Sequence, residues 1–161
     1  MPAYYLETSA LFKRYRTEPG SNVVRELFDL RRPDETLSTS YLSVLELTST
    51  ASRLMRGRVI RASQYAGLIR AFRNDIAGYR IDMLPVEDAL VDEAINLYPG
   101  DPLRGADALH FASALRVNAV TAPDFYLVSG DRELGNAARR HRLKVLDPED
   151  AGALAYLRSI R

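Results

Sequence analysis

The chain of 161 residues contains no cysteine and only two histidines. Without cysteine it has neither a disulfide framework nor a thiolate metal site, which fits a reducing cytosol. The two histidines, His110 and His141, are too few for a typical zinc site. The first six residues lack the basic start and long apolar core of a signal peptide, and no stretch approaches the ~20 apolar residues of a membrane span. We therefore expect a soluble, cytoplasmic protein with no membrane partner.

The chain also lacks a large net charge, because 22 basic residues face 21 acidic ones and leave +1 at pH 7. Such a balance excludes a surface that is basic all round, so any polyanion must be held locally. Lys13 and Lys144 are the only lysines, and the other basic residues are all arginine. Arginine is the better bidentate phosphate donor, although the codon usage of a GC-rich genome would give the same excess.

No repeat, low-complexity tract or Ser/Gly-rich linker divides the chain, so we expect one domain over residues 1–161 that buries about two-thirds of its unfolded surface. Short apolar runs alternate with segments of helical spacing. Strands are predicted at residues 3–6, 36–40, 79–84, 125–129 and 143–146. The first helix is predicted to begin with Thr8 or Ser9 as its N-cap. Further helices are predicted over about 23–30, 41–55, 59–77, 87–98, 103–118, 132–141 and 148–160. This alternation predicts an α/β fold with a parallel sheet covered on both faces.

The helix that begins near residue 103 carries an acid on its apolar face. Leu103, Asp107, His110, Phe111 and Ala114 follow one another at steps of three and four residues and so share that face. An ionised aspartate there needs a partner or a metal ion. His110 is the candidate partner within the helix, while a backbone N–H group or an escape at the helix edge would also satisfy Asp107.

Three further acids stand at comparable places. Glu7 follows the first strand, Asp131 follows the strand at 125–129, and Glu46 lies at the border of the apolar face of the helix at 41–55. Each also has a local explanation. Ser43-x-x-Glu46 matches a capping box, and Asp131 is a suitable N-cap for the helix that follows it.

A common site would explain all four acids at once, because ligands of parallel sheets bind outside the carboxyl ends of the strands. Converging carboxylates repel one another unless a cation neutralises them. All-oxygen ligation suits Mg²⁺ or Mn²⁺. Such a site can bind a phosphodiester, acidify a water molecule and stabilise the leaving oxygen. Hydrolysis of a nucleic acid is therefore the leading chemistry.

Four segments carry a resemblance to a known family. Residues 5–11, 45–47, 103–110 and 127–134 resemble, in order and spacing, the four acidic motifs of PIN domains, and most closely those of VapC-type toxins from bacterial toxin–antitoxin pairs. The resemblance spans nearly the whole chain. It implies a three-layer α/β/α fold with a mostly parallel sheet and a protruding αα-hairpin.

The resemblance also implies an activity and its partners. These are a Mg²⁺- or Mn²⁺-dependent endoribonuclease, an RNA substrate, a cognate antitoxin with a segment in the groove, and a homodimer formed through the αα-hairpin region. By position, the metal ligands and catalytic acids would be Glu7, Glu46, Asp107 and Asp131. Thr8 or Ser9 would support the metal or the phosphate.

One residue departs from the family's pattern, because the first motif usually has Asp where this chain has Glu7. The extra methylene moves the carboxylate by about 1.5 Å, and a misplacement on that scale can reduce a rate about a hundredfold. Three interpretations remain: a site rebuilt around the longer side chain, a slow enzyme, or an inactive form that binds RNA or an antitoxin without cutting. A receiver-type phosphotransfer domain also clusters acids at strand ends, but Lys144 lies inside the last expected strand rather than after it.

Basic residues near the acids are candidate phosphate contacts. Arg104 and Arg132 each lie close to a site acid in sequence, and Lys13 and Arg14 lie on the first helix. The alternative for each of them is a surface salt bridge.

Overall fold

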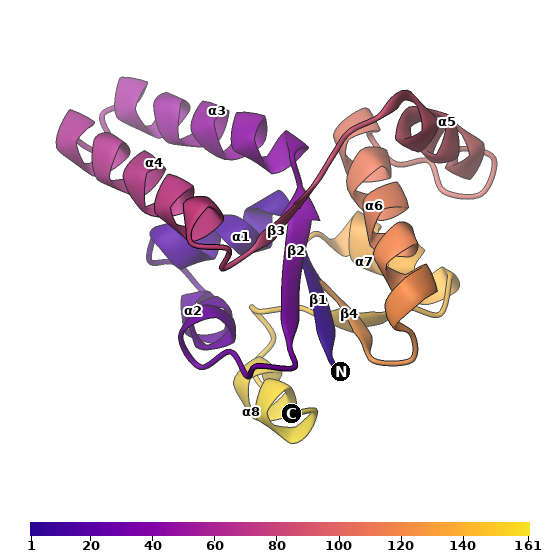
Figure 1. The fold of residues 1–161 in the computed structure, drawn as a ribbon. Helices are drawn as coiled ribbons and strands as arrows, with labels where there is room; N and C mark the ends of the chain where they lie inside the picture. The colour runs from indigo at the N-terminus through magenta and orange to yellow at the C-terminus, as the bar shows by residue number, and fades with distance from the viewer.

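The computed structural model describes all residues from 1 to 161. Its centre is a five-stranded sheet in the order β3-β2-β1-β4-β5 (Figure 1). Every neighbouring pair of strands is parallel. The strands are β1 (Ala3–Leu6), β2 (Thr36–Ser40), β3 (Asp82–Leu84), β4 (Phe125–Val128) and β5 (Lys144–Leu146). The strand order reverses between β1 and β4, which is where ligands of such sheets bind.

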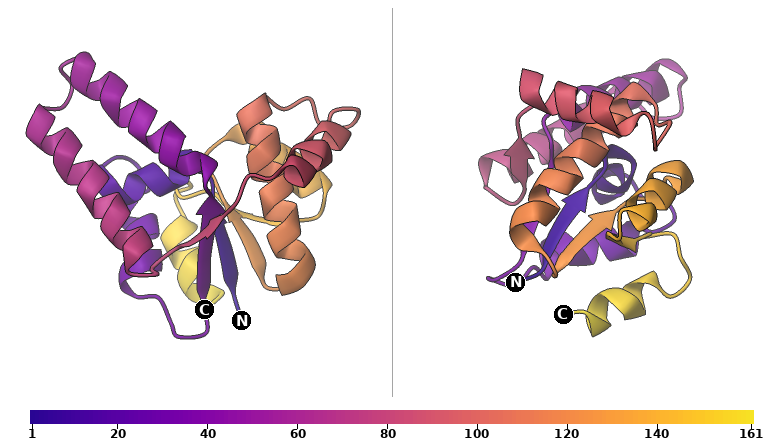
Figure 2. Two further views of the ribbon diagram at one scale, coloured as in Figure 1. Left: turned by 45° about the horizontal axis from the view of Figure 1, so that its top comes forward. Right: turned by 90° about the vertical axis from the view of Figure 1, so that its right-hand side faces the viewer.

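Eight helices connect and cover the strands. They are α1 (Thr8–Tyr15), α2 (Ser21–Asp29), α3 (Leu42–Arg56), α4 (Ala62–Ala77), α5 (Asp88–Leu97), α6 (Gly105–Thr121), α7 (Arg132–Arg140) and α8 (Ala153–Ser159). Helices α1, α2 and α8 lie on one side of the sheet, and α5, α6 and α7 lie on the other (Figures 1 and 2). Helices α3 and α4 form an antiparallel hairpin that projects from the α1 side.

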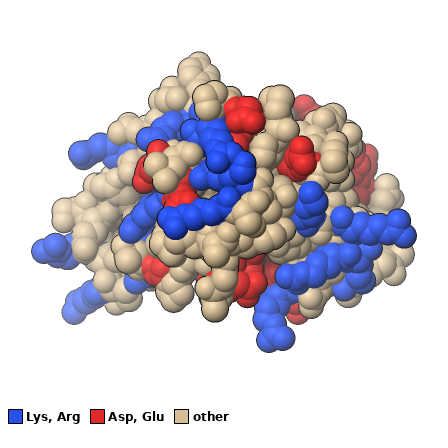
Figure 3. Space-filling view, turned by 90° about the horizontal axis from the view of Figure 1, so that it is seen from below, with Lys and Arg blue, Asp and Glu red and all other residues tan.

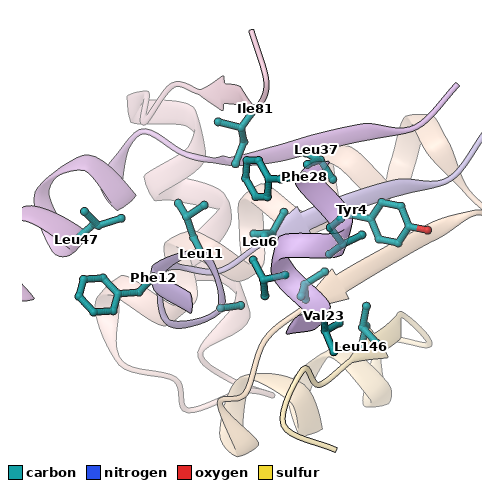
Figure 4. Close-up of a cluster of buried hydrophobic side chains, with 14 of the residues drawn as sticks. Tyr4, Leu6, Leu11, Phe12, Val23, Phe28, Leu37, Leu47, Ile81 and Leu146 are labelled. Carbon is teal, nitrogen blue, oxygen red and sulfur yellow. The ribbon is translucent and has the colours of Figure 1, made fainter. Parts of the chain in front are cut away.

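The alternation of side chains along β1 creates two separate cores. Tyr4 and Leu6 pack with α1, α2 and α8 in a core of 20 buried residues, part of which is shown in Figure 4. Ala3 and Tyr5 face the opposite way and pack with α5, α6 and α7 in a second core of 15 buried residues. The predicted three-layer α/β/α fold with a parallel sheet and a protruding αα-hairpin is therefore confirmed.

Several predicted boundaries need correction. Helix α1 begins at Thr8, and its N-cap is Glu7 rather than Thr8 or Ser9. Arg58 and Tyr79 have left-handed φ angles of 57° and 52°, so the turns that contain them extend further than predicted. As a result α4 starts at Ala62, and β3 is confined to three residues.

Two more helices have different lengths from those expected. Helix α6 continues to Thr121, beyond the end expected near residue 118. Helix α8 begins only at Ala153, because the side chain of Asp147 accepts the N–H of Glu149 and forms a turn there. No helix of this chain combines the length and the hydrophobicity required to span a lipid bilayer.

Candidate active site

Glu7 lies where β1 passes directly into α1. Its side chain folds back over the helix N-terminus: Oε1 accepts the backbone N–H of Ser9 at 2.7 Å, and Oε2 accepts the Ser9 hydroxyl at 2.5 Å. The Ser129 hydroxyl, at the end of β4, donates to the same Oε2 at 3.3 Å. Only 7% of Glu7 is exposed. The longer side chain of glutamate thus caps its own helix and joins the ends of β1 and β4.

Glu46 reaches the same edge of the sheet from α3. Its Oε2 lies 2.5 Å from the Thr8 hydroxyl and 2.8 Å from Nε2 of His110. Burial acts to raise the pKa of Glu46, but the hydrogen bonds from His110 and Thr8 outweigh it and hold the pKa below its ordinary value. Glu46 is therefore ionised at neutral pH and is held in place by α1 and α6.

The capping-box explanation of Glu46 is wrong. The N-cap of α3 is Tyr41, whose side chain makes no capping hydrogen bond. Ser43 instead lies within hydrogen-bond distance of Thr8 (2.9 Å) and Thr39 (2.8 Å). The side chains of Ser43 and Glu46 therefore join α3 to the sheet edge rather than satisfy their own helix.

His110 is almost completely buried and links the sheet to Glu46. Nδ1 lies 2.8 Å from the Tyr5 hydroxyl and Nε2 lies 2.8 Å from Glu46. Burial raises the pKa of Tyr5, so its hydroxyl keeps its proton and can donate to Nδ1. The tautomer with hydrogen on Nε2 satisfies both contacts. The prediction that His110 is the partner of Asp107 is wrong, because its ring points toward β1 and α3.

Asp107 lies in the first turn of α6 and is the least compensated acid of the group. Its carboxylate makes no hydrogen bond, and burial together with the negative charges of Asp131, Glu7 and Glu46 raises its pKa. Four acids from four separate parts of the chain are thus close enough to influence one another.

Asp131 both caps a helix and belongs to the acidic group. It is the N-cap of α7, because Oδ1 accepts the N–H of Leu134 at 2.8 Å, so the capping explanation is correct. Its own N–H donates to Ser129, whose hydroxyl also contacts Glu7. The charge of Asp131 raises the pKa of Asp107 as well. Capping and membership of the acidic group therefore do not exclude each other.

A groove of about 550 Å³ opens between α1 and α3 beside this acidic group. Glu7, Glu46 and Thr8 line it, and Arg16 and Arg53 are its cationic lining residues. Asp107 and Asp131 are outside its lining. The groove therefore gives an extended ligand access to one side of the acidic group.

The donor set suits a hard divalent cation, because all four acids offer oxygen. The raised pKa of Asp107 is a sign of negative charge that a cation would relieve. No group of three or more His, Asp or Glu side chains is preset in a ligand arrangement. The oxygens of Glu7 are turned onto Ser9 and Ser129, and Oε2 of Glu46 onto Thr8 and His110. The residues fit a metal in charge and donor type, and their side chains must reorient to bind it.

The candidate phosphate contacts fall into two classes. Lys13 is buried between Glu18 and Glu149, and Arg14 pairs with Asp29 and Asp75. For these two residues the salt-bridge explanation is correct. Arg104 precedes α6 and Arg132 is the first residue of α7; both are exposed and neither forms an ion pair. Arg104 and Arg132 are therefore available to bind an anion.

Sequence reasoning missed three supporting residues of this site. Tyr5 lies within an apolar strand, and only the face of β1 on which it sits brings its hydroxyl to His110. Ser43 looked like part of a cap. Ser129, which immediately precedes Gly130-Asp131 at a strand end, was the one with a usable signal, because that position faces the site edge.

Comparison with known proteins gives a consistent result. The profile of the PIN domain family matches residues 4–140. The chain is 35% identical to Ribonuclease VapC35 of Mycobacterium tuberculosis over 147 residues, which cover 91% of this chain and 98% of the relative. It is 34% identical to Ribonuclease VapC45 of the same species over 154 residues, which cover 92% and 100%.

Solved structures share the fold at low sequence identity. PAE2754 from Pyrobaculum aerophilum superposes with a TM-score of 0.61 at 17% identity, covering 99% of this chain and 95% of that one. VapBC2 from Rickettsia felis, solved bound to a DNA fragment from its promoter, gives 0.60 at 14% identity and covers 89% and 96%. A toxin–antitoxin complex from Klebsiella pneumoniae gives 0.58 at 12% identity and covers 90% and 97%. The chain belongs to the PIN domain family, among its VapC-type members.

Proposed function

We propose that this protein is a metal-dependent endoribonuclease that acts as the toxin of a toxin–antitoxin pair in the cytoplasm. The observation that carries the proposal is the group of four carboxylates at the carboxyl edge of the sheet, in which Asp107 has a raised pKa and no hydrogen-bonded partner. The relatives named as ribonucleases support the same chemistry.

In this proposal Glu7, Glu46, Asp107 and Asp131 hold Mg²⁺ or Mn²⁺. When bound, the ion supplies a more acidic water molecule and stabilises the charge of the leaving oxygen. The protein's own residues position these ligands. Thr8 and His110 hold Glu46, and Ser9 and Ser129 hold Glu7.

Two arginines complete the proposed site. Arg104 and Arg132 are the first basic residues beside Asp107 and Asp131, and their free guanidinium groups suit the phosphates next to the cleaved bond. Replacing Arg132 should weaken RNA binding and reduce its salt dependence by about one contact.

The test is cleavage of a mixed single-stranded RNA by the purified protein in Mg²⁺ or Mn²⁺. We expect cleavage that Asp107→Asn reduces at least about a hundredfold, since it removes a ligand from the reacting centre. Equal cleavage by both proteins would contradict the proposal. So would a lack of cleavage that Glu7→Asp, which restores the family's usual residue, fails to rescue.

The alternative is a PIN domain that binds RNA or an antitoxin without cutting, and Glu7 is the observation that favours it. With both oxygens engaged by Ser9, Glu7 could remain a helix cap rather than become a ligand. This alternative predicts RNA binding that survives EDTA and Asp107→Asn, with no cleavage by either protein.

We also propose two protein partners. One is a cognate antitoxin with a segment in the groove between α1 and α3, in line with the toxin–antitoxin complexes that share this fold.

The other proposed partner is a second copy of the chain, which would contact the base of the αα-hairpin, where Tyr41 is 60% and Leu45 is 69% exposed. Sedimentation should then give a dimer that Leu45→Arg converts to a monomer, and a wild-type monomer would contradict the second proposal.

A further inference from the structure

The αα-hairpin carries a concentration of unpaired positive charge. Residues 42–77 contain six arginines and only two acids, Glu46 and Asp75. Glu46 belongs to the acidic group, and Asp75 is buried and accepts hydrogen bonds from Arg14 and Tyr15. The six arginines are all exposed and none forms an ion pair. They are Arg53, Arg56, Arg58, Arg61, Arg70 and Arg73.

Outside the hairpin, many of the arginines are paired with acidic side chains. Arg14, Arg116, Arg140, Arg158 and Arg161 all form ion pairs with carboxylates. The net charge of the chain is only +1. In Figure 3, the left-hand extremity, toward which the hairpin projects in Figure 1, shows basic side chains without acidic ones. Positive charge is therefore concentrated on the hairpin, and other unpaired arginines, such as Arg104 and Arg132, lie outside it.

Four of these arginines extend from the acidic group along α3 and into the turn that follows it. Arg53 lines the groove that contains Glu7 and Glu46, together with Ser49 and Thr50 on the same helix. At 1.5 Å per residue, Arg53 lies about 10 Å and Arg56 about 15 Å along α3 from Glu46. Arg58 and Arg61 follow in the turn between α3 and α4. A line of cationic and hydroxyl side chains thus runs from the site to the tip of the hairpin.

We propose that Arg53, Arg56, Arg58 and Arg61, the arginine arm, bind the backbone phosphates of RNA on one side of the cleaved bond. This inference rests on the proposed function and extends it to nucleotides beyond the reacting one, because about 15 Å exceeds the size of a single nucleotide. Guanidinium and hydroxyl groups are usual donors to phosphate, and contacts to phosphate carry no base specificity. The arm would therefore hold RNA of many sequences and favour long over short substrates.

An acidic protein segment is the other polyanion that such an arm could meet. The α3 wall of the groove includes the apolar residues Leu45 and Leu54. Its polar residues Ser49, Thr50 and Arg53 form a path from Glu46 to the arm, and this path favours RNA. Protein interfaces depend on buried aromatic and aliphatic anchors, whereas nucleic-acid backbones are held mainly by charge and hydroxyl donors. A polyglutamate peptide therefore serves as the competing ligand in the binding experiment.

The experiment measures RNA binding in EDTA, where the RNA stays uncut, by fluorescence anisotropy between 50 and 300 mM NaCl. The probes are a mixed 20-nucleotide RNA and a 4-nucleotide RNA. We expect Arg53→Gln/Arg56→Gln to weaken binding of the long RNA and to reduce its logarithmic salt slope by about 1.4, since each phosphate contact on a single strand contributes about 0.7. Binding of the short RNA should change little.

The matched control is Arg31→Gln/Arg142→Gln, which removes the same charge. Arg31 precedes β2 and Arg142 precedes β5, so both lie at the amino edge of the sheet, opposite the site, and neither forms an ion pair. An unchanged slope in the arm variant, or an equal change in the control, would overturn the proposal. So would a loss of affinity for a polyglutamate peptide without a loss for RNA.

The arm and the proposed function can fail separately. Binding of long RNA through the arm by a protein that never cleaves RNA would remove the nuclease and keep the arm. Cleavage that the arm variant performs on long RNA with unchanged KM and salt dependence would keep the nuclease and remove the arm.

Discussion

Among individual residues, Asp107 is the acid that the fold compensates least. Burial and three negative neighbours raise its pKa above its ordinary value of 3.8. A raised pKa in the folded state means that this carboxyl favours folding below its unfolded pKa, and that this contribution is lost as the pH rises through the folded value. At neutral pH the ionised Asp107 therefore lowers stability unless a cation is bound.

Asp107→Asn should therefore make the metal-free protein more stable at neutral pH. In EDTA at pH 7 the variant should unfold at a higher temperature than the wild type, because asparagine removes a charge that burial and three acidic neighbours disfavour. The gain should disappear below about pH 3.8, where the wild-type carboxyl is protonated in both states. Adding Mg²⁺ should raise the melting temperature of the wild type more than that of the variant. Calorimetry at several pH values checks all three, and a variant that is less stable in EDTA would refute the argument.

Thr8 is the residue through which α1 controls Glu46. Its hydroxyl contacts Glu46, Ser43 and His110. Thr8→Val keeps the shape but leaves these buried groups short of a partner, so we expect a loss of about 1–3 kcal/mol in unfolding free energy and slower RNA cleavage. Thr8→Ser should recover both properties. Urea denaturation and initial cleavage rates provide the measurements, and a serine variant as impaired as the valine one would assign the effect to packing.

At the scale of elements, one close contact fixes how α2 meets the loop before α8. Gly20 precedes α2 with φ of 82°, and a Cβ atom there would lie 2.6 Å from the carbonyl oxygen of Pro148. Gly67, inside α4, has nothing within 4 Å of the same position. The two glycines form a matched pair.

We therefore predict opposite effects of the same substitution. Gly20→Ala should lower the unfolding free energy by about 1–3 kcal/mol, because it combines a left-handed φ with a backbone clash. Gly67→Ala should raise it by about 0.5–1 kcal/mol, since alanine is the better helix former at an open position. Urea denaturation of both variants is the test. A Gly20→Ala protein as stable as the wild type would show that α8 and its loop are free to move away.

The elements also show which parts of the site the sequence could reveal. The acids Glu7 and Asp131 were predictable at the carboxyl edge because Glu7 directly follows β1, Asp131 lies just past the end of β4, and parallel strands end at the same edge. The partner of His110 was not, since it depends on how α6 is rotated against β1 and not on spacing within α6. The turns around Arg58 and Tyr79 were also hidden, because neither residue type signals a positive φ.

In the molecule as a whole, the two edges of the sheet differ in how their charged side chains are paired. The carboxyl edge collects four acids, and one of them, Asp107, has no hydrogen-bonded partner and a raised pKa. The amino edge holds a closed ion pair between Glu35, just before β2, and Arg161 at the other end of the chain. Its two hydrogen bonds measure 2.7 and 2.9 Å, and the side chains are 0% and 5% exposed. The carboxyl edge therefore suits ligand binding. At the amino edge the ion pair holds Arg161 beside the start of β2.

This contrast predicts that the Glu35–Arg161 pair supports stability without affecting RNA chemistry. Arg161→Met should lower the unfolding free energy by about 3–5 kcal/mol, because it leaves the buried charge of Glu35 with the backbone N–H of Arg32 as its remaining partner. Glu35→Gln/Arg161→Met should recover much of that loss, since the charge is then removed from both sides. Urea denaturation of the single and double variants gives the coupling energy. RNA cleavage by the folded double variant should match the wild type, and a reduced rate would show that the two edges are energetically linked through the sheet.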